Sequence, residues 1–391
     1  MHMDWNGWCD ALRDVMPRVQ EDFRLLHRCP ELSGHEAQTR RLVADTLTEL
    51  GITVRLFDGC HSLMGTLRNG DGPCVAIRAD MDALPIHENS GLPYASERPG
   101  VMHACGHDAH TAMALGSAMW LSENRHAWRG TVKWLFESAE ETTGDARIMA
   151  RQGCMADPAV DVVIGQHVNP RYPAGTFFGK PGCVNGSSDS VTLTVRGRSG
   201  HGAYPESGVD AILITAQVLS ALQLLISREL SPFEPVAMTF GKIQGGTAGN
   251  VICDRVTVTG TLRTLTAETR ERMIRRIGET VSGVAAAMGG EGRAEIMPCY
   301  PPLFNDDARY AVVEAAALET LGEERVVRRE KPSLGVESFS FFLDDTPGVF
   351  YDIGCGVGSA LHTDTFRVDE GTLLPGVALQ CAAVLAFLSI T

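Results

Sequence analysis

The sequence predicts an α/β fold: a mixed, mostly parallel sheet flanked by helices, with a two-layer α+β domain inserted into it. Short β-branched apolar runs alternate with helical patterns in the first 185 residues and again after residue 298. This alternation is typical of strands joined by crossover helices. Between the two segments, strand patterns alternate polar and apolar residues, as in a sheet with one wet face. We therefore expect one domain from residues 1–185 and 299–391, and an inserted domain from 186–298.

The first domain begins with two predicted amphipathic helices, at 12–28 and 36–50. Ser33 and Glu36 form a capping-box pattern before the second helix, and Gly51 ends it. The remaining elements follow in chain order: strands at 65–68, 74–79, 131–136 and 160–165, helices at 111–123 and 145–152, then helix 307–321, strand 348–353 and a helix from about residue 369.

The inserted segment has a different pattern. Its predicted elements are strand 190–196, helix 210–227, strands 236–243 and 254–265, and helix 266–288. A β-α-β-β-α order favours a small sheet with its helices on one face, a unit of about 110 residues that can form its own core.

Composition excludes several classes of protein. The 391 residues carry a net charge of −14, which argues against nucleic acid because duplex binding needs a basic face. No apolar run approaches the ~20 residues that span a bilayer, and the acidic start does not resemble a secretory signal. We expect a cytoplasmic protein with no membrane partner. An anionic substrate would need local positive groups or metals.

One stretch, residues 103–110, concentrates unusual chemistry. It holds three histidines, a cysteine and an aspartate, and Cys105 is the one of eleven cysteines that lies in a histidine cluster. Thiolate and neutral imidazole are ligands for borderline-soft divalent metals, whereas a purely structural cluster would bury costly polar groups. No C-x-x-C pair is present, so zinc fingers are not supported. The stretch predicts a metal site.

Polar side chains follow three of the predicted strands. Asp80 and Asp82 follow the second strand, Glu140 and Glu141 the third, and His167 the fourth. Ligands of open α/β sheets bind at the carboxyl ends of the strands, so these groups are expected to converge. The acidic pair could be a solvated strand end, or one carboxylate could hold a metal while its neighbour takes a proton from water. Taken alone, His167 would be interpreted as a core histidine. Together with the acidic residues at the other strand ends, it is predicted to be a metal ligand.

Four further residues are weak candidates when taken singly. His362 follows a glycine-rich loop, and His201 lies in another loop of the inserted domain. Asn250 and Arg263 have equally simple alternatives, a turn-forming asparagine and a solvated arginine.

These motifs, in this order, resemble the M20 family of metallopeptidases and aminoacylases. The similarity is to the amidohydrolase branch, which includes hippurate hydrolases, N-acyl-amino-acid deacylases and plant auxin-conjugate hydrolases. The matching stretches span about residues 20–385 and include 78–85, 102–111, 139–141, 166–168, 200–201, 245–252, 260–263 and 361–362.

The resemblance implies a site for two divalent ions, zinc, manganese, nickel or cobalt, in a catalytic domain. The implied ligands are Cys105, shared between the ions, and His107, Glu141, His167 and His362. Glu140 would be the general base, and Asp82 would orient a ligand. The inserted domain would act as a lid and form a homodimer, in which His201 reaches the partner's active site and stabilises the oxyanion. Asn250 and Arg263 would hold the substrate carboxylate.

The sequence departs from the family pattern at four places. Asp80 stands where other branches have a histidine ligand, and Ser138 stands where proline is common. Glu206 replaces a second histidine after His201, and Ser338 replaces an acidic residue after Glu337. None of these changes removes an implied ligand or the base, but they leave the substrate preference open.

The function implied is hydrolysis of the amide bond of an N-acyl amino acid, hippurate-like or N-acetyl, with Glu140 taking a proton from a water between the metals. The alternative within the family is a dipeptidase or carboxypeptidase. A non-catalytic binding protein on the same fold would be expected to lack the base or a ligand, and both are present here.

Overall fold

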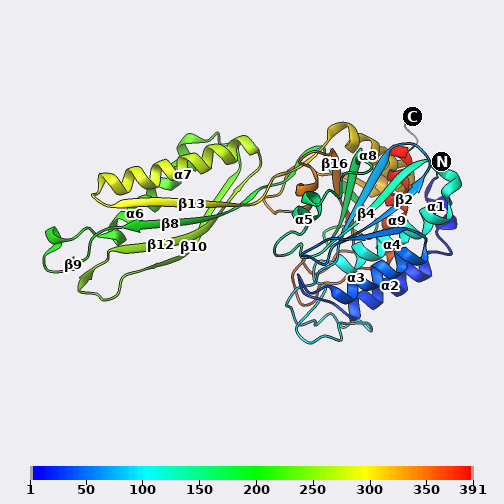
Figure 1. Ribbon diagram of the computed structural model, residues 1–391, viewed down its shortest axis with the longest axis horizontal. Helices are drawn as coiled ribbons and strands as arrows, with labels where there is room; N and C mark the ends of the chain where they lie inside the picture. The colour runs from blue at the N-terminus through cyan, green and yellow to red at the C-terminus, as the bar shows by residue number, and fades with distance from the viewer. Residues whose placement is uncertain (1–2, 389–391) are drawn as a thin grey trace. The chain divides into compact units, whose positions relative to one another are not determined.

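The computed structural model describes residues 3–388, and the chain divides into two compact units (Figure 1). The first unit comprises Met1–Val184, Phe304–Lys331 and Ser338–Thr391, and the second comprises Asn185–Leu303 and Pro332–Glu337. The second unit thus regains six residues late in the chain, a return that no feature of the sequence pattern indicated.

The first unit is built on an eight-stranded sheet with the strand order β1-β2-β4-β3-β5-β16-β6-β15. Its central neighbours β4, β3, β5 and β16 run parallel, while β1 and β2 are antiparallel additions at one edge. This mixed, mostly parallel sheet confirms the predicted fold class. The strand bounds are β1 (Thr53–Leu56), β2 (Leu63–Asn69), β3 (Cys74–Asp80), β4 (Gly130–Glu137), β5 (Val162–Asn169), β6 (Phe177–Gly179), β15 (Val326–Arg328) and β16 (Gly348–Gly354); β7 (Gly182–Asn185) and β14 (Leu303–Asn305) pair separately.

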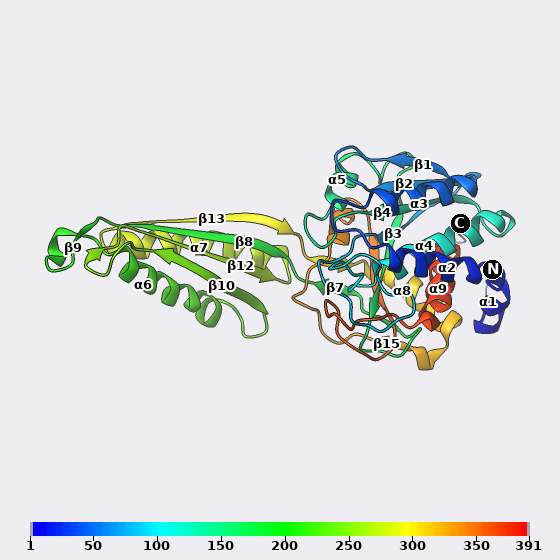
Figure 2. The ribbon, with the colours of Figure 1, turned by 90° about the horizontal axis from the view of Figure 1, so that it is seen from below.

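Helices pack on both faces of this sheet, as its buried strands require. Every residue of β3 and β4 is buried, and α4 packs on β3 and contacts both α2 and α9 (Figure 2). The helix bounds are α1 (Trp5–Ala11), α2 (Met16–Arg28), α3 (Ala37–Glu49), α4 (His107–Glu123), α5 (Ala146–Arg151), α8 (Asp307–Leu321) and α9 (Leu373–Leu388).

Helix α4 begins four residues before its predicted start, at His107. Gly106 precedes it with φ +83°, and a Cβ there would come within 2.4 Å of the Val168 side chain. Only glycine fits this close, left-handed turn. The turn places the Cys105–His107 stretch against the end of β5.

The second unit is a four-stranded antiparallel sheet with the order β10-β12-β8-β13 and its own hydrophobic core. Helices α6 and α7 both contact this sheet and each other (Figure 2). The bounds are β8 (Ser188–Arg196), α6 (Ala211–Leu224), β10 (Val236–Gly245), β12 (Arg255–Thr264), α7 (Ala267–Ala287) and β13 (Glu291–Tyr300), with a short pair of β9 (Gly200–His201) and β11 (Val251–Ile252).

Two stretches of the described chain are long and apolar enough to cross a membrane, Ala211–Glu229 and Glu370–Leu388. The second is 78% buried within the protein, as a core helix would be, and the first is 33% buried. Length and composition alone do not separate a core helix from a spanning one.

Candidate metal centre

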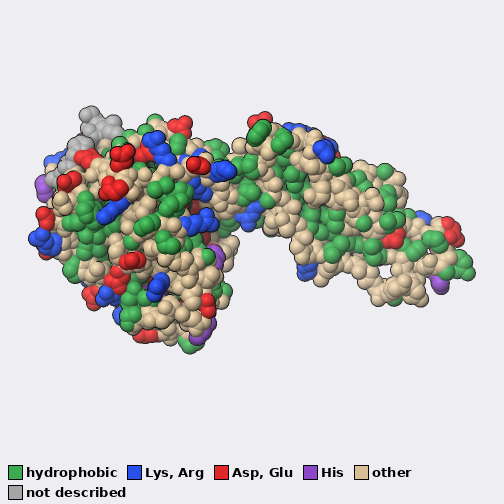
Figure 3. All heavy atoms as spheres, turned by 180° about the vertical axis from the view of Figure 1, so that it is seen from behind, with side chains coloured by type: hydrophobic (Ala, Val, Ile, Leu, Met, Phe, Trp, Pro, Cys, Tyr) green, Lys and Arg blue, Asp and Glu red, His purple; other side chains and the backbone are tan. Residues whose placement is uncertain are grey.

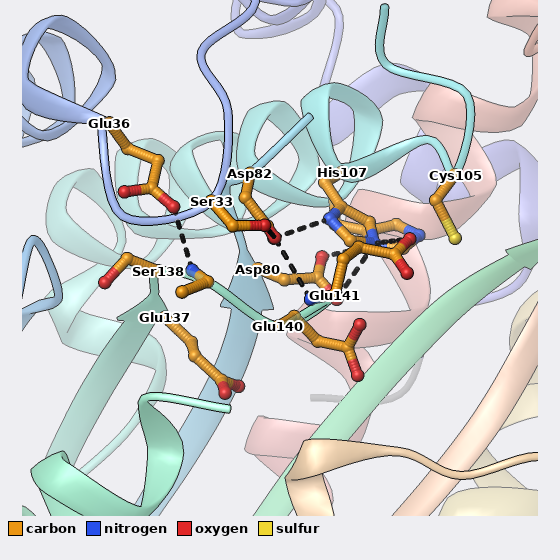
Figure 4. A network of polar contacts seen from close by, with 12 residues as sticks. Ser33, Glu36, Asp80, Asp82, Cys105, His107, Glu137, Ser138, Glu140 and Glu141 are labelled. Carbon is orange, nitrogen blue, oxygen red and sulfur yellow. Dashed lines mark hydrogen bonds and ion pairs between the residues drawn. The ribbon is translucent and has the colours of Figure 1, made fainter. Parts of the chain in front are cut away.

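The polar side chains at the carboxyl ends of the parallel strands converge as the sequence predicts (Figure 4). Parallel pairing sets Asp80 of β3 beside Glu137 of β4, and the chain continues from each into the cluster. Possible ligand atoms of Cys105, His107 and Glu141 all lie within 4.8 Å of one another. A second such group joins His107 to Asp80, His110 and His167.

Two imidazole rings each present one nitrogen to this cluster. The Nδ1 atom of His107 lies 3.0 Å from Oδ1 of Asp82, and its buried Nε2 atom has no hydrogen bond. The Nδ1 atom of His167 lies 2.8 Å from the carbonyl oxygen of Val168, and its Nε2 atom lies 3.4 Å from the Cys105 sulfur. A protein acceptor on Nδ1 fixes the tautomer that leaves Nε2 free for a cation, so both rings fit a metal.

Glu141 and His362 complete the cluster from distant parts of the sequence. The Oε1 atom of Glu141 lies 3.0 Å from Nε2 of His362 and 3.9 Å from Nε2 of His107. His362 has φ +62°, an uncommon conformation for a residue with a side chain, and its backbone N–H donates to the carbonyl oxygen of Ala104. This bond holds the loop beside Cys105.

The buried carboxylates Asp80 and Asp82 favour positive charge in the cluster, carried either by protons or by a metal ion. Burial raises the pKa of the Cys105 thiol well above its usual value. Burial opposes the charged form of His107, but Asp80 and Cys105 outweigh it and raise the pKa of the ring. Asp80 and Asp82 are fully buried beside these groups. The donor set of thiol, imidazole and carboxylate therefore fits divalent metal ions of borderline softness.

His110 is engaged at both ring nitrogens. Its Nδ1 atom lies 2.5 Å from Oδ1 of Asp80, and its Nε2 atom accepts from the backbone N–H of Val168 at 2.9 Å. Burial lowers the pKa of His110 to about 4, which agrees with a neutral ring that accepts at Nε2. His110 therefore supports the cluster by linking β3 to β5. His103 is buried too, and burial lowers its pKa to about 4.

Glu140 leaves the end of β4 through a strained turn. Ala139, just before it, has φ +55°, and its carbonyl oxygen accepts from the N–H groups of Thr143 and Gly144. The Oε1 atom of Glu140 accepts from the backbone N–H of Ser338 at 3.3 Å. The turn directs the adjacent carboxylates Glu140 and Glu141 to different partners.

The three candidate residues of the second unit do not lie together. His201 pairs with Val251 in the short β9–β11 sheet, and Asn250 lies just before β11, where its carbonyl oxygen accepts from the Gly202 N–H. Arg263 lies eight residues along β12 from Arg255, about 26 Å at the usual rise of a strand. Its guanidinium reaches the carbonyl oxygen of Leu334, at the end where the chain enters this unit. Arg263 and the His201–Asn250 pair are therefore separated by the length of β12.

The capping-box prediction for Ser33 and Glu36 is wrong. Glu36 precedes α3 without a side-chain capping bond, and the carboxylate of Glu31 instead accepts from the N–H groups of Gln38 and Thr39. The Ser33 hydroxyl instead bonds to Asp82, and the Glu36 carboxylate accepts from the backbone N–H of Ala139, next to Ser138 (Figure 4). The sequence shows the acidic and hydroxyl residues ahead of the helix, but their spacing is compatible both with capping of α3 and with bonds to distant parts of the chain.

Arg78 and its contact with Ser338 were not predicted from the sequence. The buried guanidinium of Arg78 binds Asp80 at 2.7 Å, Glu137 at 2.7 Å and the Ser338 hydroxyl at 2.8 Å. It joins the ends of β3 and β4 to the segment that contacts Glu140. An arginine inside a buried strand was the available signal, because such a charge needs partners.

A buried histidine next to the cluster, His27, is expected to make the free energy of unfolding depend on pH. His27 lies 2.6 Å from Asp108 and 3.1 Å from Glu88; burial opposes its charge, but these carboxylates raise its pKa to about 10. Its contribution to stability, about 5 kcal/mol, is complete below pH 6.5 and is lost as the pH rises through 10. Urea unfolding from pH 6 to 10 should show a flatter loss of stability in His27→Gln than in the parent. Replacing the exposed His126 by glutamine should leave the profile unchanged.

Comparison with known proteins agrees with this geometry. Residues 76–386 match the peptidase family M20/M25/M40. A probable hydrolase of Synechocystis is 40% identical over 93% of this chain and 94% of its own length. The N-acetyl-L-cysteine deacetylase of Bacillus subtilis is 36% identical over 90% of this chain and 83% of its own length.

Solved structures of similar proteins share this fold. A putative aminohydrolase of methicillin-resistant Staphylococcus aureus superimposes with a TM-score of 0.93 at 33% identity, over 97% of this chain and 98% of the other. A dinuclear metal-binding M20 peptidase of Bacillus subtilis gives 0.86 at 30% identity, over 97% and 100%. The predicted resemblance is confirmed: the chain belongs to the peptidase family M20/M25/M40 and is a metal-dependent amide hydrolase.

Proposed function

We propose that this protein hydrolyses the amide bond of N-acyl amino acids, with hippurate-like and N-acetyl compounds as the substrate class. The observation that carries the proposal is the pair Glu140–Glu141 at the end of β4. Glu141 faces His107 and His362, while Glu140 is held separately by the Ser338 N–H. A carboxylate beside, but outside, a ligand cluster is suited to proton transfer.

The residues that would hold two divalent ions are Cys105, His107, Glu141, His167 and His362. Zinc, manganese, nickel and cobalt all suit this donor set. When bound, such ions supply Lewis acidity that polarises the scissile carbonyl and increases the acidity of water. Asp82 orients His107 through Nδ1 and so directs Nε2 into the site.

Glu140 provides the proton transfers in this proposal. Its carboxylate takes a proton from the attacking water as the C–O bond forms, and returns it to the amide nitrogen as the C–N bond breaks. The products are a free carboxylic acid and an amino acid. The Ser338 N–H, donating to Oε1, fixes the direction from which the carboxylate acts.

Arg263, Asn250 and His201 supply substrate recognition and oxyanion stabilisation. Local positive charge is needed because the chain carries a net charge of −14 and the substrate is an anion. Arg263 lies at the opposite end of β12 from the other two residues. One inserted unit cannot bring all three to one small substrate.

A homodimer resolves this separation, with His201 of the partner subunit and Asn250 of the partner subunit completing a site that contains Arg263 of the first. The second unit offers a surface for such a partner. Ile212, Leu213 and Leu224 of α6 are each 54% exposed, and hydrophobic side chains are exposed on this unit (Figure 3). Strand β10 is an unpaired edge of the sheet.

We also propose a cytoplasmic location for the protein.

A peptidase acting on dipeptides is the second candidate, because the similar dinuclear structure from Bacillus subtilis is described as a peptidase. Protein reconstituted separately with Zn²⁺, Mn²⁺, Co²⁺ and Ni²⁺ should be assayed against N-acetyl and N-benzoyl amino acids and matched free dipeptides. Product chromatography should show higher kcat/KM for the N-acyl series. Preference for dipeptides would favour the peptidase, and cleavage of neither series with bound metal would contradict both.

A further inference from the structure

The segment 31–36, between α2 and α3, makes four contacts with the chain that follows the strands β3 and β4. The Glu31 carbonyl oxygen accepts from the Ala83 N–H at 2.8 Å, and Leu32 forms an isolated parallel bridge with Ala83. The Ser33 hydroxyl donates to Asp82, and the Glu36 carboxylate accepts from the Ala139 N–H. The segment therefore bonds to the chain after β3 and to the chain after β4.

Ser33 holds the face of Asp82 that does not touch His107. Its hydroxyl donates to Oδ2 of Asp82 at 2.6 Å, and the Glu141 N–H donates to the same oxygen at 3.0 Å. Oδ1 is left for the His107 ring. With both oxygens engaged, the carboxylate has one orientation, which in turn fixes the ring.

Glu36 holds the turn that carries the base. Its Oε1 atom accepts from the N–H groups of Ala139, at 2.8 Å, and Gly34, at 2.9 Å. Ala139 has φ +55°, and a non-glycine residue persists in that conformation only when its surroundings enforce it. The Glu36 bond is a direct restraint on this residue, one position before Glu140.

The position of Glu36 is costly for the fold. The side chain is fully buried, its Oε2 atom has no hydrogen bond, and burial raises its pKa to about 7. Capping of α3 does not explain this cost, because Glu31 performs it. Glu36 is thus a buried acid whose side-chain contacts go to Gly34 and to the turn before the base.

We propose that Ser33 and Glu36 are positioning residues: Ser33 orients Asp82 toward a metal ligand, and Glu36 locks the Ala139 turn so that Glu140 and Glu141 point to different partners. The inference rests on the proposed roles of Glu140 and the ligand set. It assigns Ser33 and Glu36 to the support of the active site, and leaves the Glu31 carboxylate to the N-terminus of α3.

The test compares Glu36→Ala, Glu36→Gln and Glu31→Ala in the full-length protein. Glu36→Ala should lower kcat by about 30- to 100-fold with KM changed less than about threefold, because a small displacement of a catalytic group is expensive. Glu36→Gln keeps an acceptor oxygen and should stay within about fivefold of the parent kcat. Glu31→Ala is the matched control: it removes a buried acceptor of two N–H groups and should lower Tm but not kcat.

A second-site variant separates positioning from general damage. Ala139→Gly placed in the Glu36→Ala background should recover at least about threefold in kcat, since glycine adopts positive φ without strain. Equal losses of kcat in Glu36→Ala and Glu31→Ala, or no rescue by either glutamine or glycine, would overturn the role of Glu36.

A readout independent of activity tests Ser33. Zn²⁺ affinity, measured by competition with a chromophoric chelator, should fall about tenfold in Ser33→Ala, the usual effect of losing a partner of a ligand-orienting group. Unchanged affinity would overturn the role of Ser33. If the parent protein hydrolysed no amide substrate while this affinity loss was observed, the proposed function would fail and the positioning of Asp82 would stand.

Discussion

Replacing Glu140 by glutamine is expected to lower kcat by about 10³- to 10⁴-fold while the metal content stays at the parent level. The amide can still accept the Ser338 N–H bond at Oε1, so the turn keeps its shape. It cannot take a proton from water at neutral pH. Hydrolysis of N-acetyl amino acids and metal analysis by mass spectrometry, performed on the same preparation, measure the two effects separately.

The neighbouring carboxylate provides the control for this experiment. Glu141→Gln should lose bound metal, because Glu141 lies 3.0 Å from His362 within the ligand cluster. The two variants make the same replacement of glutamate by glutamine at neighbouring positions. Parent-like turnover by Glu140→Gln would remove Glu140 from the mechanism, and exchanged metal contents would reverse the two roles.

Mixing two inactive variants is expected to restore activity if the site is shared between subunits. His201→Ala alone should lower kcat by about 10²- to 10³-fold, as loss of an oxyanion donor does. A heterodimer of His201→Ala with Glu140→Gln carries one site with both groups intact. After subunit exchange of an equal mixture, about one quarter of the parent activity should return, because half of the dimers are mixed and each has one working site.

The mixture also distinguishes the alternatives. If His201 acted within its own chain, each site of every dimer would lack one group, and the mixture would be as inactive as its components. A mixture of Arg263→Ala with Glu140→Gln is the control: both residues are proposed to serve one site from the same chain. In that pair each site of a mixed dimer lacks one of the two groups, so no recovery is expected, whereas Arg263→Ala mixed with His201→Ala should again recover about one quarter of the parent activity.

The site was predictable from the sequence where its chemistry follows the ends of strands. Asp80, Glu141 and His167 each follow or end an apolar run, and parallel strands present their carboxyl ends at one edge. The clustering of Cys105 and His107 was visible as composition. His362 needed the family resemblance, because its approach depends on one backbone bond to Ala104.

Other features could not be predicted from the sequence, because they depend on the surrounding fold. Strand β13 alternates charged and apolar residues in its first half, but it contains glycine and proline, which are uncommon inside strands, and β15 has only three residues. His110 has the same residue type and spacing as a ligand, and only its two occupied nitrogens mark it as a support. A spacing typical of a helix cap at Ser33 and Glu36 conceals contacts with partners that lie some 50 and 100 residues away.

Because Glu31, Ser33 and Glu36 each bind a different part of the fold, the length of the loop before α3 is fixed. Glu31 fixes it to the helix, while the other two reach separate strand ends. Inserting or deleting one residue between Ser33 and Glu36 would keep all three side chains and yet move at least one of them away from its partner. Such a connection tolerates changes of identity at its exposed positions far better than changes of length, in contrast to ordinary surface loops.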